Sequence, residues 1–132
     1  MQIHYLTIPE ALMIYAEIVG VSAVAESDVQ NLSGLESALG QPQQTFDGKD
    51  LYRTIEDKAG ALLYSLCMNH PFTDGNKRFA FIACRAFLRR HGLDLEVDTG
   101  ETVDFMHSVA KGELSAEKVA QWLGQRLRVF NR

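Results

Sequence analysis

The chain has 132 residues, 46% of them hydrophobic and 23% charged, which suits one soluble globular domain spanning 1–132. Its net charge of −4 argues against general binding of nucleic acid, which favours a basic surplus. No run approaches the roughly 18 apolar residues that span a bilayer, and no secretory signal is visible, so we expect a cytoplasmic protein without membrane contact. Cys67 and Cys84 stand alone in apolar stretches, and we expect both to be buried, reduced thiols.

Side chains suited to capping recur along the chain, and we predict a helix after each of them. The first two lie in capping boxes, in which a Ser or Thr and a Glu three residues later satisfy each other's backbone N–H groups. The predicted caps, in chain order, are Thr7, Ser33, Thr54, Thr99 and Ser115. The first helix runs to about Val19 before Gly20, and Gly40 with Pro42 close the second.

A further helix is predicted from around Asp74 or Gly75 to near Gly92. Its middle, 79–84, is apolar on all sides, which indicates a buried central helix. The other helices are expected to turn apolar stripes toward it, including Leu62, Leu66, Val103, Met106, Val109, Val119, Trp122, Leu123 and Leu127. Strand signals are nearly absent. The sequence therefore predicts an all-α fold, a compact bundle around one buried central helix.

The most informative stretch is 70–78, which reads His-Pro-Phe-Thr-Asp-Gly-Asn-Lys-Arg. It combines a candidate base, a carboxylate, a glycine, an amide and two cations just before an apolar helix. Those groups are what the handling of a nucleoside triphosphate requires. The stretch resembles the signature of the Fic/Doc family, and its lysine in place of a second glycine is the Doc form. The resemblance extends over nearly the whole chain and implies the compact helical Fic/Doc core.

His70 is the candidate catalytic base. The proline that follows disfavours helical backbone, so we expect the preceding helix to end here and His70 to be extended. Imidazole has an unperturbed pKa near ~6.5 and accepts a proton from a hydroxyl at cellular pH. The alternative is a histidine that is merely exposed, or one whose hydrogen bonds are satisfied within the fold. The neighbouring residues of the motif favour the catalytic base. No comparable motif surrounds His4, His91 or His107, and we expect them to be structural or surface residues.

The rest of the motif predicts a site for magnesium and phosphate. Asp74 is either the helix N-cap or an oxygen ligand of Mg²⁺, and the resemblance favours the metal. Gly75 lets a phosphate approach the backbone, while Asn76 and Arg78 supply donors near the positive end of the helix dipole. Local capping by Asn76 and a surface salt bridge for Arg78 are the alternatives. Phe72 is expected to anchor the loop in the core.

Lys77 decides between two reactions. In family members that transfer AMP, a glycine stands here and leaves space for the α- and β-phosphates. A lysine fills that space and adds a charge, and the resemblance to Doc implies a reversed nucleotide with its γ-phosphate toward His70. AMP-transferring members also have a second arginine three residues after Arg78, where this chain has Phe81, a predicted core residue. For Arg85 we expect a salt bridge.

The resemblance implies a Doc-like toxin of a toxin–antitoxin pair, a protein kinase that uses ATP and Mg²⁺ to modify a Ser or Thr. It implies a threonine of elongation factor Tu as the target, and hence inhibition of translation. Transfer of AMP and a catalytically inactive binding module are the alternatives. The self-inhibitory helix of some relatives is not found, since the nearest pattern, Ser22 to Glu26, is followed by Ser27. We therefore expect a separate antitoxin with a segment that folds on binding. Whether the polar segment 41–51 aligns the target stays open.

Overall fold

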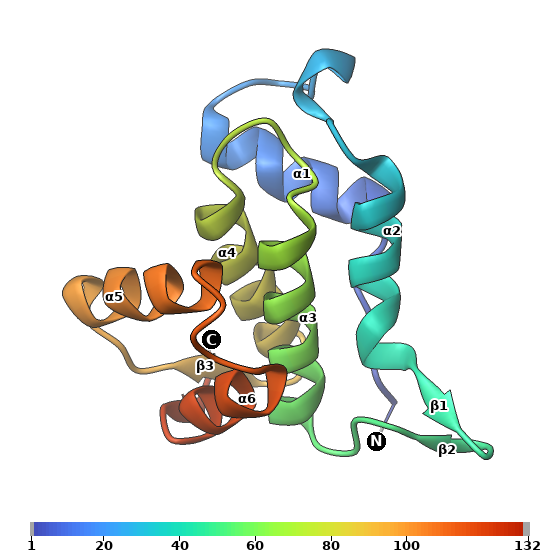
Figure 1. Ribbon diagram of the computed structural model, residues 1–132, viewed down its shortest axis with the longest axis vertical. Helices are drawn as coiled ribbons and strands as arrows, with labels where there is room; N and C mark the ends of the chain where they lie inside the picture. Colours follow the sequence, from blue (N-terminus) through green and yellow to red (C-terminus); the bar gives the residue numbers. More distant parts are fainter. Residues whose placement is uncertain (1, 131–132) are drawn as a thin grey trace.

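Helices make up most of the chain in the computed structural model, which describes residues 2–130 (Figure 1). The α-helices are α1 (Ile8–Val19), α2 (Leu32–Gly40), α3 (Ile55–Asn69), α4 (Asn76–Arg89), α5 (Thr99–Ala110) and α6 (Ala116–Gly124). Two 3-10 turns flank α2, namely η1 (Glu26–Asp28) and η2 (Gln41–Gln43). Within residues 2–130, no helix has the length and apolar character that a membrane crossing needs. The predicted all-α class is confirmed.

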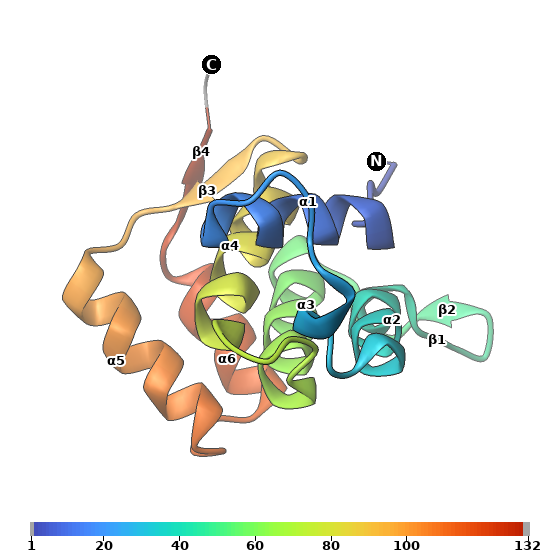
Figure 2. The same cartoon turned by 90° about the horizontal axis from the view of Figure 1, so that it is seen from above.

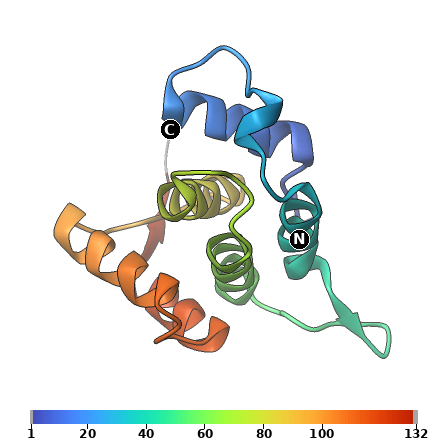
Figure 3. The ribbon, with the colours of Figure 1, turned by 45° about the horizontal axis from the view of Figure 1, so that its top comes forward.

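Two helices, α3 and α4, share the centre of the bundle. Figure 3 shows them nearly end-on, with α1 above, α2 to the right, and α5 and α6 at the lower left. At Gly60, α3 comes so close to α6 that a Cβ would lie 2.8 Å from the Cα of Ala120. The prediction of α4 as the single central helix is therefore incomplete, because α3 packs against α2, α4, α5 and α6. Buried side chains of the two helices include Leu62, Leu63, Leu66, Phe79, Ala83, Phe87 and the free thiols of Cys67 and Cys84.

The helix starts follow side-chain caps. Three predicted caps are confirmed, each accepting a hydrogen bond from the backbone N–H three residues later: Thr7, Thr54 and Ser115. The starts predicted at Ser33 and Thr99 are wrong by two residues and one residue, because Asn31 caps α2 and Asp98 caps α5. Asn and Asp are strong N-caps, so the nearest earlier amide or carboxylate takes the position.

The described part of the chain contains two small antiparallel sheets that the sequence does not predict (Figure 2). The first is a hairpin of β1 (Thr45–Phe46) and β2 (Lys49–Asp50), and the second pairs β3 (Leu93–Leu95) with β4 (Leu127–Val129). Leu127 therefore lies in a strand and not on the last helix as expected. Strands of two or three residues carry too little alternation to be recognised in a sequence.

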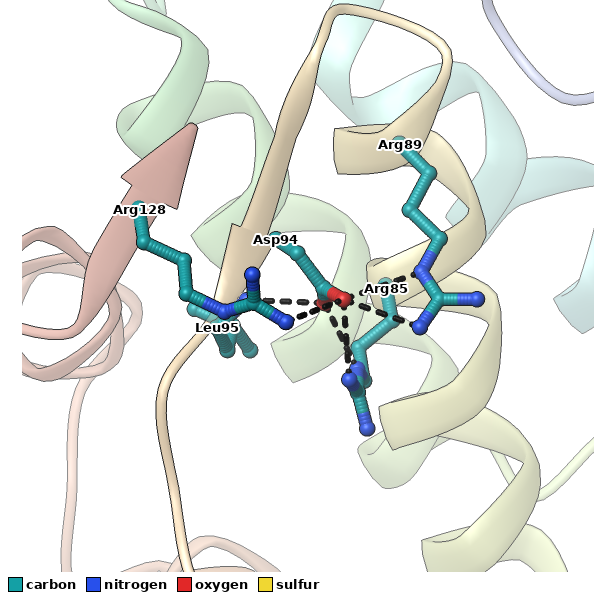
Figure 4. Close-up of polar contacts among 5 residues, drawn as sticks. All are labelled: Arg85, Arg89, Asp94, Leu95 and Arg128. Atoms are coloured by element: carbon teal, nitrogen blue, oxygen red, sulfur yellow. Dashed lines mark hydrogen bonds and ion pairs between the residues drawn. The ribbon is translucent and has the colours of Figure 1, made fainter. Parts of the chain in front are cut away.

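A buried carboxylate ties the second sheet to α4 (Figure 4). Asp94 of β3 is fully buried and accepts hydrogen bonds from Arg85 at 2.8 and 3.0 Å and from Arg89 at 3.1 and 2.9 Å. Arg128 of β4 adds an ion pair at 3.6 Å. Burial raises the pKa of Asp94, but the hydrogen bonds from Arg85, the Leu95 N–H and Arg89 outweigh it and hold that pKa well below its usual range. Arg85 is thus in a salt bridge, as expected.

Candidate active site

The motif forms the loop between α3 and α4 and the first turn of α4. His70 follows the last residue of α3 and is exposed. Its backbone is left-handed, with φ 46° and ψ 61°, so the prediction of extended backbone is wrong. This region is strained for a residue with a Cβ, and a hydrogen bond of 3.1 Å from the Gln30 side chain holds the His70 carbonyl in place. The turn ends α3 and leaves the imidazole at the surface.

The segment 28–31 supports the loop from outside the motif. The carbonyl of Pro71 accepts two backbone N–H bonds from this segment, at 3.0 and 3.1 Å. The N–H of Thr73 donates back to it at 3.0 Å, and an antiparallel bridge joins Val29 to Phe72. Bonds between backbone groups have no side-chain signature, which is why the sequence gives no sign of this support.

Phe72 anchors the loop in the core, and this prediction is confirmed. Its side chain is fully buried and lies parallel to the ring of Tyr15, with 3.7 Å between the ring centroids. Phe79 packs edge-on against it at 4.9 Å. Tyr15 also donates its hydroxyl to the carbonyl of Asp74 at 3.0 Å. Sequence reasoning missed Tyr15, because it lies on the distant α1 within an ordinary apolar pattern.

Asn76 holds the loop closed. Its side-chain oxygen accepts from the N–H of Phe72 at 3.0 Å, and its amide nitrogen donates to the carbonyl of Phe72 at 2.9 Å. An amide can pair with both polar groups of one residue and still keep its second N–H for a ligand. The local bonds are therefore compatible with a contact between Asn76 and phosphate, which stays a prediction.

The N-terminus of α4 offers donors to an anion. Gly75 is the N-cap, with φ 75° and no side-chain hydrogen bond, so the N–H groups of the first turn are available to a ligand. Lys77 and Arg78 are exposed. Neither forms an ion pair with another residue in the range 2–130, so the surface salt bridge considered for Arg78 is not found there. This geometry is consistent with the predicted phosphate site.

Asp74 is exposed, directly before the N-cap. One carboxylate oxygen accepts the N–H of Gly75 at 2.8 Å, and the other has no hydrogen-bond partner among residues 2–130. No three His, Cys, Asp or Glu side chains of the described residues gather where they would hold a metal by themselves. Magnesium that is bound together with a nucleotide takes one or two carboxylates plus phosphate oxygens and water. A single carboxylate beside a phosphate site therefore fits this ion.

A cleft of about 450 Å³ lies between α4 and α5, beside Lys77 and Arg78. Its lining is largely apolar, and it includes Phe81, Ile82, Val103 and Met106. Val103, predicted to face the core, is 46% exposed because it faces this cleft instead. The volume lies within the usual range of small-molecule sites.

The segment 41–51 lies far from this site. It forms η2 and the β1–β2 hairpin, which projects from the end of α3 opposite His70 (Figure 1). Lys58, near the start of α3, is 2% exposed and holds Asp50 of the hairpin at 3.0 Å. The hairpin and the motif loop thus lie at opposite ends of α3, which has 15 residues and is about 22 Å long. The geometry gives no support to this segment as the element that aligns a target, and 28–31 lies beside the motif loop instead.

Comparison with known proteins gives three matches. The profile of the Fic/DOC family matches residues 5–88. "Toxin Doc" of Mycolicibacterium smegmatis is 38% identical over 97 residues, which are 72% of this chain and 75% of that protein. "Protein kinase doc" of Escherichia phage P1 is 32% identical over 88 residues, which are 67% of this chain and 68% of that protein. The family match takes in the motif loop and the helices from α1 through nearly all of α4, whereas α5, which lines the other side of the cleft, lies outside it.

Proposed function

The chain belongs to the Fic/DOC family, and from that premise we propose that it is a Doc-like toxin and a protein Ser/Thr kinase. It transfers the γ-phosphate of ATP to a hydroxyl of a target protein. One observation carries the choice of reaction. Lys77, which has no ion-pair partner among residues 2–130, stands in the first turn of α4, and the buried Phe81 follows one turn later. A small residue and a second cation at these two positions are what AMP transfer would use.

His70 is the proposed general base. It takes the proton from the Ser or Thr hydroxyl as the hydroxyl oxygen bonds to the γ-phosphorus. The bond from the γ-phosphorus to the β,γ-bridging oxygen breaks, and ADP leaves with that oxygen. The left-handed turn at His70 keeps the imidazole exposed beyond the end of α3, where a target side chain has access to it.

The charge on the phosphates is balanced by the start of α4. Its free first-turn N–H groups, with Lys77 and Arg78, donate to phosphate oxygens. Gly75 leaves the backbone open to a phosphate, since among the described residues, its chain neighbours aside, only the Tyr15 ring lies within 4 Å of a Cβ placed there. Asp74 would hold Mg²⁺, which neutralises charge on the transferring phosphoryl when bound.

The cleft between α4 and α5 is the proposed place for the nucleoside. Its apolar lining suits a base and ribose, and it begins at Lys77 and Arg78, which are proposed to bind the phosphates. Val103→Trp is expected to fill the cleft and weaken nucleotide binding, because Val103 lines the cleft and is 46% exposed. The position lies outside the motif loop, so the site itself is preserved.

AMP transfer is the second candidate reaction, and the surroundings of Phe81 weigh against it. Phe81 is 8% exposed and stands where a second cation would contact the nucleotide. The next cation on α4 is Arg85. It donates two hydrogen bonds to the buried Asp94 and is therefore not free to take the place of that second cation. A binding module without activity is less favoured still, because such a module has no use for an exposed base and carboxylate on a tightly held loop.

The target and the inhibitor complete the proposal. The proposed target is a threonine of elongation factor Tu in the cytoplasm, whose modification would stop translation. The proposed inhibitor is an antitoxin with a segment that folds on this domain. The nearest match to a self-inhibitory helix, Ser22 to Glu26, is not helical up to Ala25, which supports control by a separate protein.

The direct test is incubation of the purified protein with γ-labelled ATP, Mg²⁺ and a bacterial translation extract. The proposal expects one labelled protein of the size of elongation factor Tu, and no label with His70→Ala. Failure of the wild-type protein to label any protein, together with failure to bind ATP, would point to the binding module.

A further inference from the structure

Tyr15 contacts the motif loop at several points although it belongs to α1. Its ring is 3% exposed and stacks on Phe72, with Phe79 packed edge-on at 6.1 Å. The same ring lies 3.9 Å from the position that a Cβ of Gly75 would occupy. Its hydroxyl donates to the carbonyl of Asp74 at 3.0 Å. One side chain thus touches the motif before, at and after the proposed metal ligand.

The peptide group between Asp74 and Gly75 is held at both ends. Its carbonyl accepts from Tyr15, and its N–H donates to the carboxylate of Asp74 at 2.8 Å. The direction of this peptide therefore fixes one carboxylate oxygen, while the other has no hydrogen-bond partner among residues 2–130.

We infer that Tyr15 is a positioning residue for the metal-binding carboxylate of Asp74, acting through the Asp74–Gly75 peptide. The inference rests on the proposed role of Asp74 in holding magnesium. Groups that orient a metal ligand from outside its coordination sphere commonly change metal affinity when they are removed. The ring of Tyr15 supports the loop by stacking, whereas its hydroxyl sets the direction of the peptide.

Tyr15→Phe separates the contribution of the ring from that of the hydroxyl, because it keeps the ring and removes the hydroxyl. We propose a titration of Mn²⁺, followed by its electron paramagnetic resonance signal, into the protein saturated with a non-hydrolysable ATP analogue. Tyr15→Phe is expected to raise the Kd for Mn²⁺ about three- to tenfold, the size expected for one hydrogen bond. Its thermal midpoint should stay close to that of the wild type. Tyr64→Phe is the matched control, since the Tyr64 hydroxyl has no hydrogen bond to a described residue and Tyr64 lies outside the motif.

Asp74→Asn separates this inference from its premise. If Asp74→Asn weakens Mn²⁺ binding and Tyr15→Phe does not, the positioning role of Tyr15 is refuted while the proposed function stands. If Asp74→Asn binds Mn²⁺ as the wild type does, the metal role of Asp74 is refuted and the inference with it. A parallel loss in Tyr15→Phe and Tyr64→Phe would also refute it, because the effect would then be unspecific.

Discussion

The side chain of Asn76 is bonded to both the N–H and the carbonyl of Phe72, at 3.0 and 2.9 Å. This pair closes a loop of five residues and joins the first turn of α4 to the buried anchor of the motif. The Asp74 carboxylate and the Gly75 N-cap lie inside the closed loop, so their positions depend on the pair.

Asn76→Ala is therefore expected to impair both stability and activity. Two backbone groups of the partly buried loop lose their partners, which costs about 1–3 kcal/mol of unfolding free energy. Urea unfolding measures this cost, and phosphate transfer should fall by more than the unfolded fraction explains. Asn76→Asp is the control, because it keeps the acceptor for the Phe72 N–H and loses only the donor. Equal stability of Asn76→Ala and wild type would contradict this account of the loop.

Replacement of His70 should separate chemistry from folding. His70→Ala and His70→Gly should both lose transfer by about 10²–10⁴ in rate, as expected for the loss of a general base. The glycine variant should be the more stable of the two by about 1 kcal/mol, since only glycine accepts the left-handed backbone without strain. Thermal melting of the two variants measures the difference. Transfer retained by a folded His70→Ala protein would exclude His70 as the base.

Asp94→Asn should be strongly destabilising, and it also loosens Arg85, which lines the cleft between α4 and α5. It removes the buried negative charge that Arg85, Arg89 and Arg128 share, and breaking a buried ion pair costs about 3–5 kcal/mol. Since Arg89 and Arg128 are nearly half exposed, water compensates in part and the lower end of that range is expected. Glu96→Gln is the control, since it changes an exposed carboxylate of the same segment. An Asp94→Asn protein as stable as the wild type would contradict this account.

Acid should unfold the protein through two carboxylates with lowered pKa values. A hydrogen bond from Arg90 lowers the pKa of Glu10 from its ordinary 4.5 to about 2, and the pKa of Asp94 is lowered as well. Because the pKa values of both groups are lower in the folded state, the stability that they contribute is fully present above their unfolded pKa values near ~4. That stability is lost as both groups are protonated in more acidic solution. Urea unfolding between pH 7 and pH 2 should show this loss, with a shallower slope in Glu10→Gln. A flat profile would contradict it.

The parts of the fold that follow local rules are predictable from sequence. Thr7, Thr54 and Ser115 cap helices because the bonds that they make lie within one turn. The pairing of β3 with β4 joins segments more than thirty residues apart, and the three-residue strands give no local signal. The buried Asp94 is missed for the same reason, since an aspartate between two leucines does not show that arginines of α4 and β4 will surround it.

The candidate site divides in the same way. The motif identifies His70, Asp74, Gly75, Lys77 and Arg78 by chemical type. It does not predict that tertiary hydrogen bonds impose left-handed backbone at His70 before a proline. Nor does it show that the amide of Asn76 is used within the loop, or that Tyr15 of α1 holds the Asp74 carbonyl. Those features depend on groups brought together only by folding.

The transfer of one labelled phosphate tests the central claim most directly. The wild-type protein is incubated with Mg²⁺, a bacterial translation extract and ATP labelled at either the α- or the γ-phosphate, with His70→Ala as control. The account predicts γ-label on a protein of the size of elongation factor Tu and no α-label. Lys77→Gly should weaken transfer of the γ-label, and any AMP transfer that it gains should be feeble while Phe81 remains. Deposition of the α-label by the wild-type protein would contradict the account and establish AMP transfer in its place.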